Sequence, residues 1–66
     1  MEMEFFDIVN DKNDHLADVI VFDDFVCDLK FNTSEKVYSF NDFFKLLRYL
    51  ETLYLPDGYN IYKKYN

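Results

Sequence analysis

Hydrophobic and polar residues follow a helical period over residues 39–54, the most regular part of the sequence. At about 100° per residue, one face collects Phe40, Phe43, Phe44, Leu47, Leu50 and Tyr54, with Leu46 and Leu53 beside it. Ser39, followed three residues later by Asp42, predicts an N-cap and a capping box. The segment 56–58, Pro-Asp-Gly, is typical of a helix end. The pattern therefore predicts an amphipathic helix that a sheet or a partner must cover.

Residues 1–9 alternate between apolar and acidic side chains, which predicts a first strand. The alternation changes phase at Phe5 and Phe6, and a β-bulge at this point would explain the change. Residues 10–15 are polar and predict a loop.

The apolar run over residues 16–31 is too long for one ordinary strand. A turn at Asp23-Asp24 would make it a hairpin in which Ile20 faces Cys27 and Phe22 faces Phe25. Asp-Asp is a weaker turn signal than Asn-Gly, so one longer bulged strand is the alternative.

The rest of the chain supplies a turn at residues 32–35, a short strand over residues 36–38 that leads into the helix, and a final segment, residues 59–65. We expect this last segment to be a short edge strand, the alternative being an ordered tail. The order of elements predicts an α+β fold, a small antiparallel sheet of three to five strands with one amphipathic helix packed across it. The 66 residues form one such domain.

Aromatic residues are unusually frequent, with eight phenylalanines and six tyrosines among 66 residues. Each buried ring removes roughly 150–250 Å² from water, but a domain this small cannot enclose so many of them. Some rings are therefore expected at the surface, where they favour contact with a partner or a second copy.

Charge is sorted along the sequence. The net charge is −6, yet residues 1–28 hold nine acids against the single base Lys12, and residues 29–66 hold four acids and six bases. This acidity argues against direct binding of nucleic acid and favours a cationic protein partner. The expected partner-binding residues are the acids Glu2, Glu4, Asp7, Asp18, Asp23, Asp24 and Asp28 together with the tyrosines Tyr49, Tyr59 and Tyr62. A core-covering role is the alternative for the tyrosines, and a solvated face that maintains solubility is the alternative for the acids.

No catalytic or cofactor motif is present, and we expect neither enzymatic activity nor a bound cofactor. Residues 11–15 resemble the start of a calcium loop, but Leu16 and Phe22 stand where its glycine and glutamate are required, so a solvated loop is predicted instead of a metal site. The lone Cys27 has no nearby base and is expected to be a small buried hydrophobe. No signal peptide or membrane-spanning run is found, so a cytoplasmic protein is expected.

Two functional hypotheses follow. In general character the chain resembles phage-encoded DNA mimics, which are short, acidic and aromatic-rich, although no motif ties it to a particular family. The first hypothesis is a phage or mobile-element inhibitor that blocks a basic host nucleic-acid-binding protein, such as a CRISPR nuclease, restriction enzyme, repair glycosylase or transcription factor. The second is a structural or assembly module that homodimerises or docks on a larger complex through exposed aromatic residues.

Overall fold

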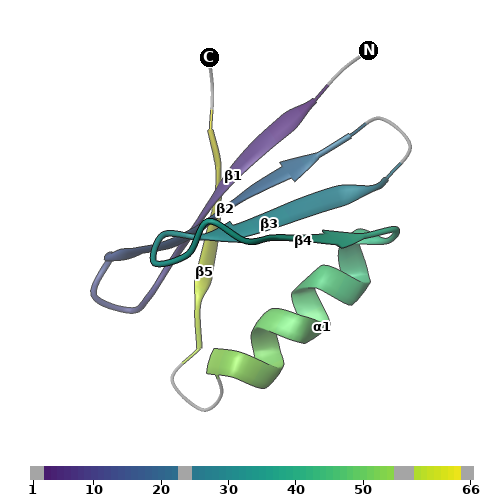
Figure 1. Cartoon of the computed structure of the whole chain (residues 1–66). Coiled ribbons are helices and arrows are strands. Elements are labelled where there is room, and N and C mark those ends of the chain that lie inside the picture. Colours follow the sequence, from purple (N-terminus) through teal and green to yellow (C-terminus); the bar gives the residue numbers. More distant parts are fainter. Residues whose placement is uncertain (1–2, 23–24, 55–57, 65–66) are drawn as a thin grey trace.

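Five antiparallel strands form one sheet in the order β4-β3-β2-β1-β5, and one helix packs against it (Figure 1). This computed structural model describes residues 3–22, 25–54 and 58–64. The elements are β1 (Glu4–Val9), β2 (His15–Val21), β3 (Cys27–Phe31), β4 (Val37–Phe40), α1 (Phe43–Tyr54) and β5 (Asn60–Lys64). The α+β fold expected from the sequence is confirmed.

Helix α1 connects the two edges of the sheet, because β4 and β5 lie at opposite ends of the strand order. Five strands spaced about 4.8 Å apart span roughly 19 Å, and a helix of 12 residues is about 18 Å long. The helix is thus the right length to cross one face of the sheet. The expected edge strand in the C-terminal segment is confirmed as β5, while Tyr65 lies outside the described residues.

The start of the helix differs from the prediction. The N-cap is Asp42, whose carboxylate oxygen accepts a hydrogen bond from the Phe44 N–H at 2.8 Å. Ser39 instead belongs to β4, and its hydroxyl donates to Asp28 at 2.7 Å. The prediction that Ser39 caps the helix was wrong, because pairing of β4 with β3 extends the strand through Phe40.

The buried side of α1 is rotated from the predicted stripe. Leu46 and Leu50 are fully buried, and Phe43, Leu47 and Tyr49 pack at the border of the core. Phe44 is 75% exposed, so its placement on the buried face was wrong. It lies about 160° around the helix axis from Leu46 and therefore points to solvent.

The hairpin between β2 and β3 is confirmed, but its register is shifted by one residue. Val21 pairs with Cys27 and Val19 with Leu29, whereas Ile20 was expected opposite Cys27. The shift follows from the loop: the Phe22 N–H donates to the Val26 carbonyl at 2.8 Å. Three residues, 23–25, therefore separate that pair, and Asp23 and Asp24 lie outside the described residues.

Because side chains alternate along a strand, this one-residue shift reverses the faces of β2. Val19 is fully buried and Ile20 is not, the reverse of the expected arrangement. Phe25, the last residue of the loop, has φ 69° and is 70% exposed. A left-handed residue at this position is typical of three-residue hairpin loops, although a phenylalanine there is uncommon.

Two further details concern β1 and β4. The sheet is regular through Phe5 and Phe6, and the irregularity lies between Ile8 and Val9, so the predicted site of the bulge was wrong. The turn at residues 32–35 is confirmed by a hydrogen bond from the Ser34 N–H to the Phe31 carbonyl at 3.2 Å. The strand after it, β4, runs two residues further than predicted.

The core lies between α1 and the covered side of the sheet. Its fully buried members are Ile8, Ala17, Val19, Cys27, Leu29, Leu46 and Leu50. Aromatic rings close its border, as in the stacked pair Phe6 and Phe43, whose centroids are 5.7 Å apart. Cys27 is a buried hydrophobe as expected, and burial, together with the nearby carboxylates of Asp28 and Asp42, raises the pKa of its thiol.

Candidate functional site

The side of the sheet turned away from α1 carries no other element in the described part of the chain (Figure 1). We call this surface the open face. Strand alternation and the observed register place two residues of each strand on it in complete rows across the sheet. They are Phe5 and Asp7 of β1, Asp18 and Ile20 of β2, Asp28 and Lys30 of β3, Val37 and Ser39 of β4, and Tyr62 and Lys64 of β5.

These ten residues form two rows that cross the strands. The first row runs Lys64, Phe5, Ile20, Asp28, Ser39, and the second runs Tyr62, Asp7, Asp18, Lys30, Val37. Each row mixes apolar and charged side chains, in contrast to the covered side, whose strand centres are apolar. Such a mixture is typical of a surface that binds another protein, where apolar contact is combined with charged residues around it.

The open face is hollowed at its centre, with a volume of about 340 Å³. The hollow has apolar and charged contributions from all five strands, so it belongs to the sheet as a whole and not to one loop. Its lining residues are Phe5, Phe6, Asp18, Val19, Ile20, Asp28, Lys30, Val37 and Lys64. A volume of this size is at the lower end of the range of small-ligand sites and would also accept one or two protruding side chains of a protein.

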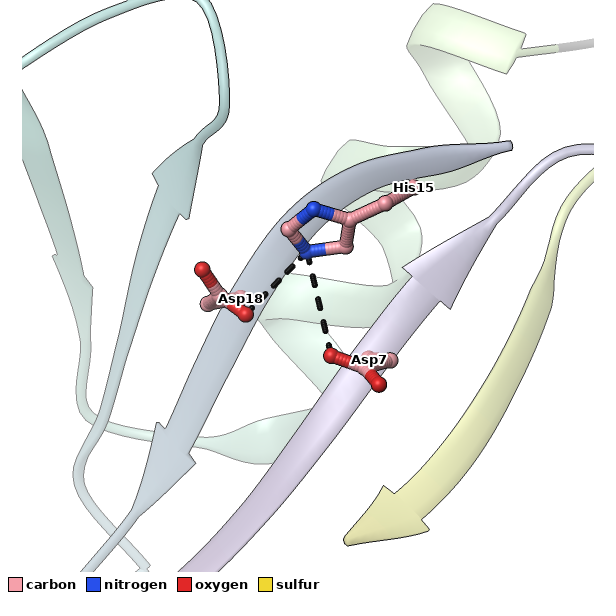
Figure 2. A group of neighbouring side chains, drawn as sticks. All are labelled: Asp7, His15 and Asp18. Atoms are coloured by element: carbon pink, nitrogen blue, oxygen red, sulfur yellow. Dashed lines mark hydrogen bonds and ion pairs between the residues drawn. The ribbon is translucent and has the colours of Figure 1, made fainter.

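A cluster of charged groups borders the hollow where β1, β2 and β5 meet. Asp7 and Asp18 are directly opposite each other on neighbouring strands, an arrangement that is unfavourable for two carboxylates. The Lys64 ammonium lies 3.0 Å from Asp7 Oδ1 and 3.1 Å from Asp18 Oδ1, and so offsets their repulsion. His15 Nε2 lies 3.1 Å from Asp18 Oδ1 and 3.7 Å from Asp7 Oδ1 (Figure 2).

These contacts shift the pKa values of Asp18 and Lys64. Desolvation acts to raise the pKa of Asp18, but hydrogen bonding and attraction to Lys64 and His15 outweigh it and lower the pKa. The hydrogen bonds to Asp7 and then Asp18 raise the pKa of Lys64. Both shifts favour the charged pair. The side chains are 34–45% exposed, so solvent weakens each interaction.

The loop before His15 fixes where the imidazole points. Asn10 Oδ1 accepts hydrogen bonds from the Lys12 and Asp14 N–H groups, each at 2.9 Å. Asn13 takes a left-handed conformation with φ 70°, which asparagine tolerates better than most residues. At the start of β2, Asn32 Nδ2 donates to the His15 carbonyl at 2.7 Å. The backbone on both sides of the histidine is thus held by side-chain amides.

The structure gathers some of the predicted acidic residues and separates others. Asp7, Asp18 and Asp28 share the open face. Glu4 projects from the other side of the sheet, where its carboxylate lies 3.8 Å from the Lys63 ammonium. The remaining three, Glu2, Asp23 and Asp24, lie outside the described residues.

Acidic and basic residues that are separated along the sequence are therefore partly brought together in the fold. Strand β5 returns the basic end of the chain to the acidic strand β1, so Lys63 and Lys64 lie among acids from the first 28 residues. The open face carries three carboxylates, Lys30 and Lys64. Its charge is close to balanced even though the chain as a whole is strongly acidic.

The three predicted tyrosines differ in their surroundings. Tyr49 packs on Tyr38 and Phe40 with ring centroids 5.8 and 5.6 Å away, so it lies at the core border, in line with the alternative core-covering role. Tyr59 also contacts the core, and its hydroxyl donates to the Leu47 carbonyl at 3.3 Å. Tyr62 is 54% exposed on the open face. Of the three, Tyr62 is the one available to a partner, and the binding role of all three stays a prediction.

Sequence reasoning missed several residues of the open face. Phe5, Ile20 and Val37 were assigned to three separate predicted strands without being recognised as parts of one surface. The pairing of Asp7 with Asp18 could have been found, since both are equally distant from the centre of the predicted loop at residues 10–15. The position of Lys64 could not, because it depends on the pairing of the first strand with the last.

Comparisons of this chain with protein-family models, curated proteins and solved structures found no match. Among the described residues, no helix has the length and apolar character needed to cross a lipid bilayer.

Proposed function

We propose that this chain is a non-enzymatic binding module that docks on another protein through the open face of its sheet. The observation that carries the proposal is the central hollow, in which the half-buried Phe5 and Ile20 and the exposed Val37 are surrounded by charges of both signs. A partner would place an apolar side chain against Phe5, Ile20 and Val37. Its charged groups would meet Asp28 and Lys30 at the border, which gives orientation more than affinity.

The described residues support a binding role more than a catalytic one. Cys27 is fully buried on the covered side, whereas His15 reaches the opposite side of the sheet, so the two cannot act together as nucleophile and base. Among the acids of the open face, Asp7 and Asp18 are partly exposed and paired with the Lys64 ammonium, and Asp28 accepts a hydrogen bond from the Ser39 hydroxyl. A hydrophobic hollow with nearby charges needs neither a nucleophile nor a cofactor to hold a partner.

The test is a binding comparison with matched variants. The tagged chain is used to capture partners from a bacterial lysate, and the retained proteins are identified by mass spectrometry. Ile20→Glu places a charge in the hollow and should abolish retention of a true partner, while Thr52→Glu on the solvent side of α1 should not. A partner retained equally by Ile20→Glu, with the variant folded by circular dichroism, would contradict docking at the open face.

A second candidate function is inhibition by DNA mimicry, in which a phage or mobile-element protein occupies the nucleic-acid site of a basic host protein. It is supported by Asp7, Asp18 and Asp28, which lie on neighbouring strands of one face, and by the net charge of −6. Lys30 and Lys64 on the same face reduce its resemblance to a phosphate backbone, and for this reason we place docking first.

Salt and DNA distinguish the two candidates. A mimic depends on charge, so its binding should fall steeply with ionic strength and duplex DNA should compete. Docking at the hollow should change little under either treatment. Asp18→Asn with Asp28→Asn should release a mimicked partner, whereas a docked one, held mainly by Phe5, Ile20 and Val37, should lose only the smaller part of its affinity that the border charges contribute. Self-association is tested by light scattering, where a mass near 8.1 kDa would exclude a stable homodimer.

A further inference from the structure

We propose that Asp7, His15 and Asp18 form a site for a divalent transition-metal ion of the zinc type. One imidazole nitrogen and two carboxylate oxygens come from neighbouring strands, and all three atoms lie within 4.8 Å of one another (Figure 2). These donor types are the ones that zinc and the metals near it accept. The site is distinct from the calcium-like loop considered from the sequence, with which it shares only His15.

The spacing of the donor atoms fits tetrahedral coordination. Ligand atoms about 2.1 Å from a shared zinc ion lie roughly 3.4 Å from each other. His15 Nε2 is 3.1 Å from Asp18 Oδ1 and 3.7 Å from Asp7 Oδ1, values on either side of this separation. The two carboxylate oxygens lie within 4.8 Å of each other, so a rearrangement that brings them closer together would complete three protein ligands, and water would supply the fourth.

The position between the carboxylates is also one that already attracts a cation. The Lys64 ammonium contacts the same oxygen atom of Asp7 and of Asp18 that faces the imidazole. The Lys64 ammonium therefore competes with a metal ion for these oxygen atoms, since the metal ion can bind only when the ammonium leaves. The flexible lysine stem on edge strand β5 allows that exchange without movement of the sheet. A lysine at this position therefore predicts moderate affinity that rises when the ammonium is removed.

Bound metal would change the open face as well as the cluster. Asp18 and Lys64 both line the hollow, so replacing an ammonium by a divalent ion and releasing the lysine stem alters its border. The metal proposal does not depend on the docking proposal, because metal affinity is measured on the isolated chain.

The test is a titration of the intact chain with zinc chloride near neutral pH, followed by calorimetry and by proton NMR of the imidazole. The sequence has one histidine, so the imidazole signals report the site without ambiguity. We expect one zinc ion per chain and a shift of the His15 signals. His15→Ala and Asp18→Asn should each weaken binding roughly tenfold or more. Lys64→Met should tighten it.

The matched control is Asp28→Asn, which removes the same charge from the same face outside the cluster and should leave zinc affinity unchanged. Cys27→Ala should also bind normally, since the thiol is buried on the other side. Circular dichroism establishes that each variant is folded. Absence of zinc binding in both the parent and Lys64→Met would overturn the proposal, as would equal affinity in His15→Ala, which would show only general attraction to acids.

Discussion

The two faces of the sheet are built from the same strands but follow different rules. On the covered side, Val19, Leu29 and Ile8 are fully enclosed beneath α1, and their contribution depends on the apolar area removed from water. On the open side, Ile20, Asp28 and Asp7 occupy alternate positions of the same strands and remain accessible. One face therefore determines whether the chain folds, while the other is free to carry a binding role. Substitutions that compare the faces directly can test this division.

The largest effect is expected in the centre of the covered side. Leu50→Ala removes a fully buried side chain of α1 and should lower the free energy of unfolding by about 2–5 kcal/mol. Leu53→Ala on the same helix is the control, because Leu53 is 47% exposed and should lose less than about 1 kcal/mol. Urea denaturation followed by circular dichroism measures both. Equal losses would mean that α1 packs on the sheet through a different side.

The next comparison tests the register of β2. Val19→Ser puts a hydroxyl in the core and should cost about 2–3 kcal/mol of stability, whereas Ile20→Ser on the open face should cost about 1 kcal/mol or less. The register expected from the sequence, with Ile20 opposite Cys27, predicts the reverse order. The same denaturation measurement decides between the two registers, and a larger loss for Ile20→Ser would refute the observed pairing.

A chemical probe examines the covered side without a substitution. Cys27 is inaccessible and burial raises the pKa of its thiol, so both accessibility and thiolate content are low at neutral pH. Its reaction with an aromatic disulfide reagent should be at least roughly tenfold slower in the native chain than in denaturant. Similar rates in the two conditions would place the thiol at the surface.

The smallest effect is expected from the ion pairs of the open face. Lys64→Met should cost less than about 1 kcal/mol, because the partners are partly exposed. The pKa of Asp18 is lower in the folded state than in the unfolded state, so this carboxylate stabilises the fold at pH values above its unfolded-state pKa. The stabilisation is lost as the pH falls through the folded-state pKa. The pKa of Lys64 is higher in the folded state than in the unfolded state, so this ammonium stabilises the fold at pH values below its unfolded-state pKa. The stabilisation is lost as the pH rises through the folded-state pKa.

The difference in unfolding free energy between the parent chain and Lys64→Met should consequently be greatest at pH values between the pKa of Asp18 and the pKa of Lys64. It should vanish in strong acid and in strong base. Thermal unfolding at a series of pH values measures it. Asp28→Asn is a control, since Asp28 has no contact with Lys64 in the described ion pairs. A difference that does not vary with pH would show that Lys64 acts through its apolar stem.

Periodicity in the sequence was sufficient for the types and order of the elements, because the apolar stripe of the helix is regular and polar turn segments divide the strands. It was not sufficient for the register of the β2–β3 hairpin. Residues 16–22 are apolar on both faces except at Asp18, so alternation alone could not say which face is buried. The register depends instead on the length of the loop that ends at Phe25.

The prediction of the helix start was wrong for a related reason. Ser39 and Asp42 are both good N-cap residues, and local preference does not choose between them. Pairing of Phe40 with Cys27 keeps Ser39 in the sheet and leaves Asp42 to begin the helix. The charged cluster needed two pieces of non-local information, the pairing of β1 with β2 and the return of β5 to β1. Only the pairing of β1 with β2 could be estimated from the sequence.

The position of β5 also bears on how the protein is made. Its partner β1 is synthesised before the other described elements, whereas Asn60–Lys64 follows all of them. Until those residues are made, one edge of β1 lacks its β5 partner, and Asp7 of β1 faces Asp18 of β2 without the Lys64 ammonium that contacts both. Completion of the sheet therefore waits for β5, which pairs the last described strand with the first.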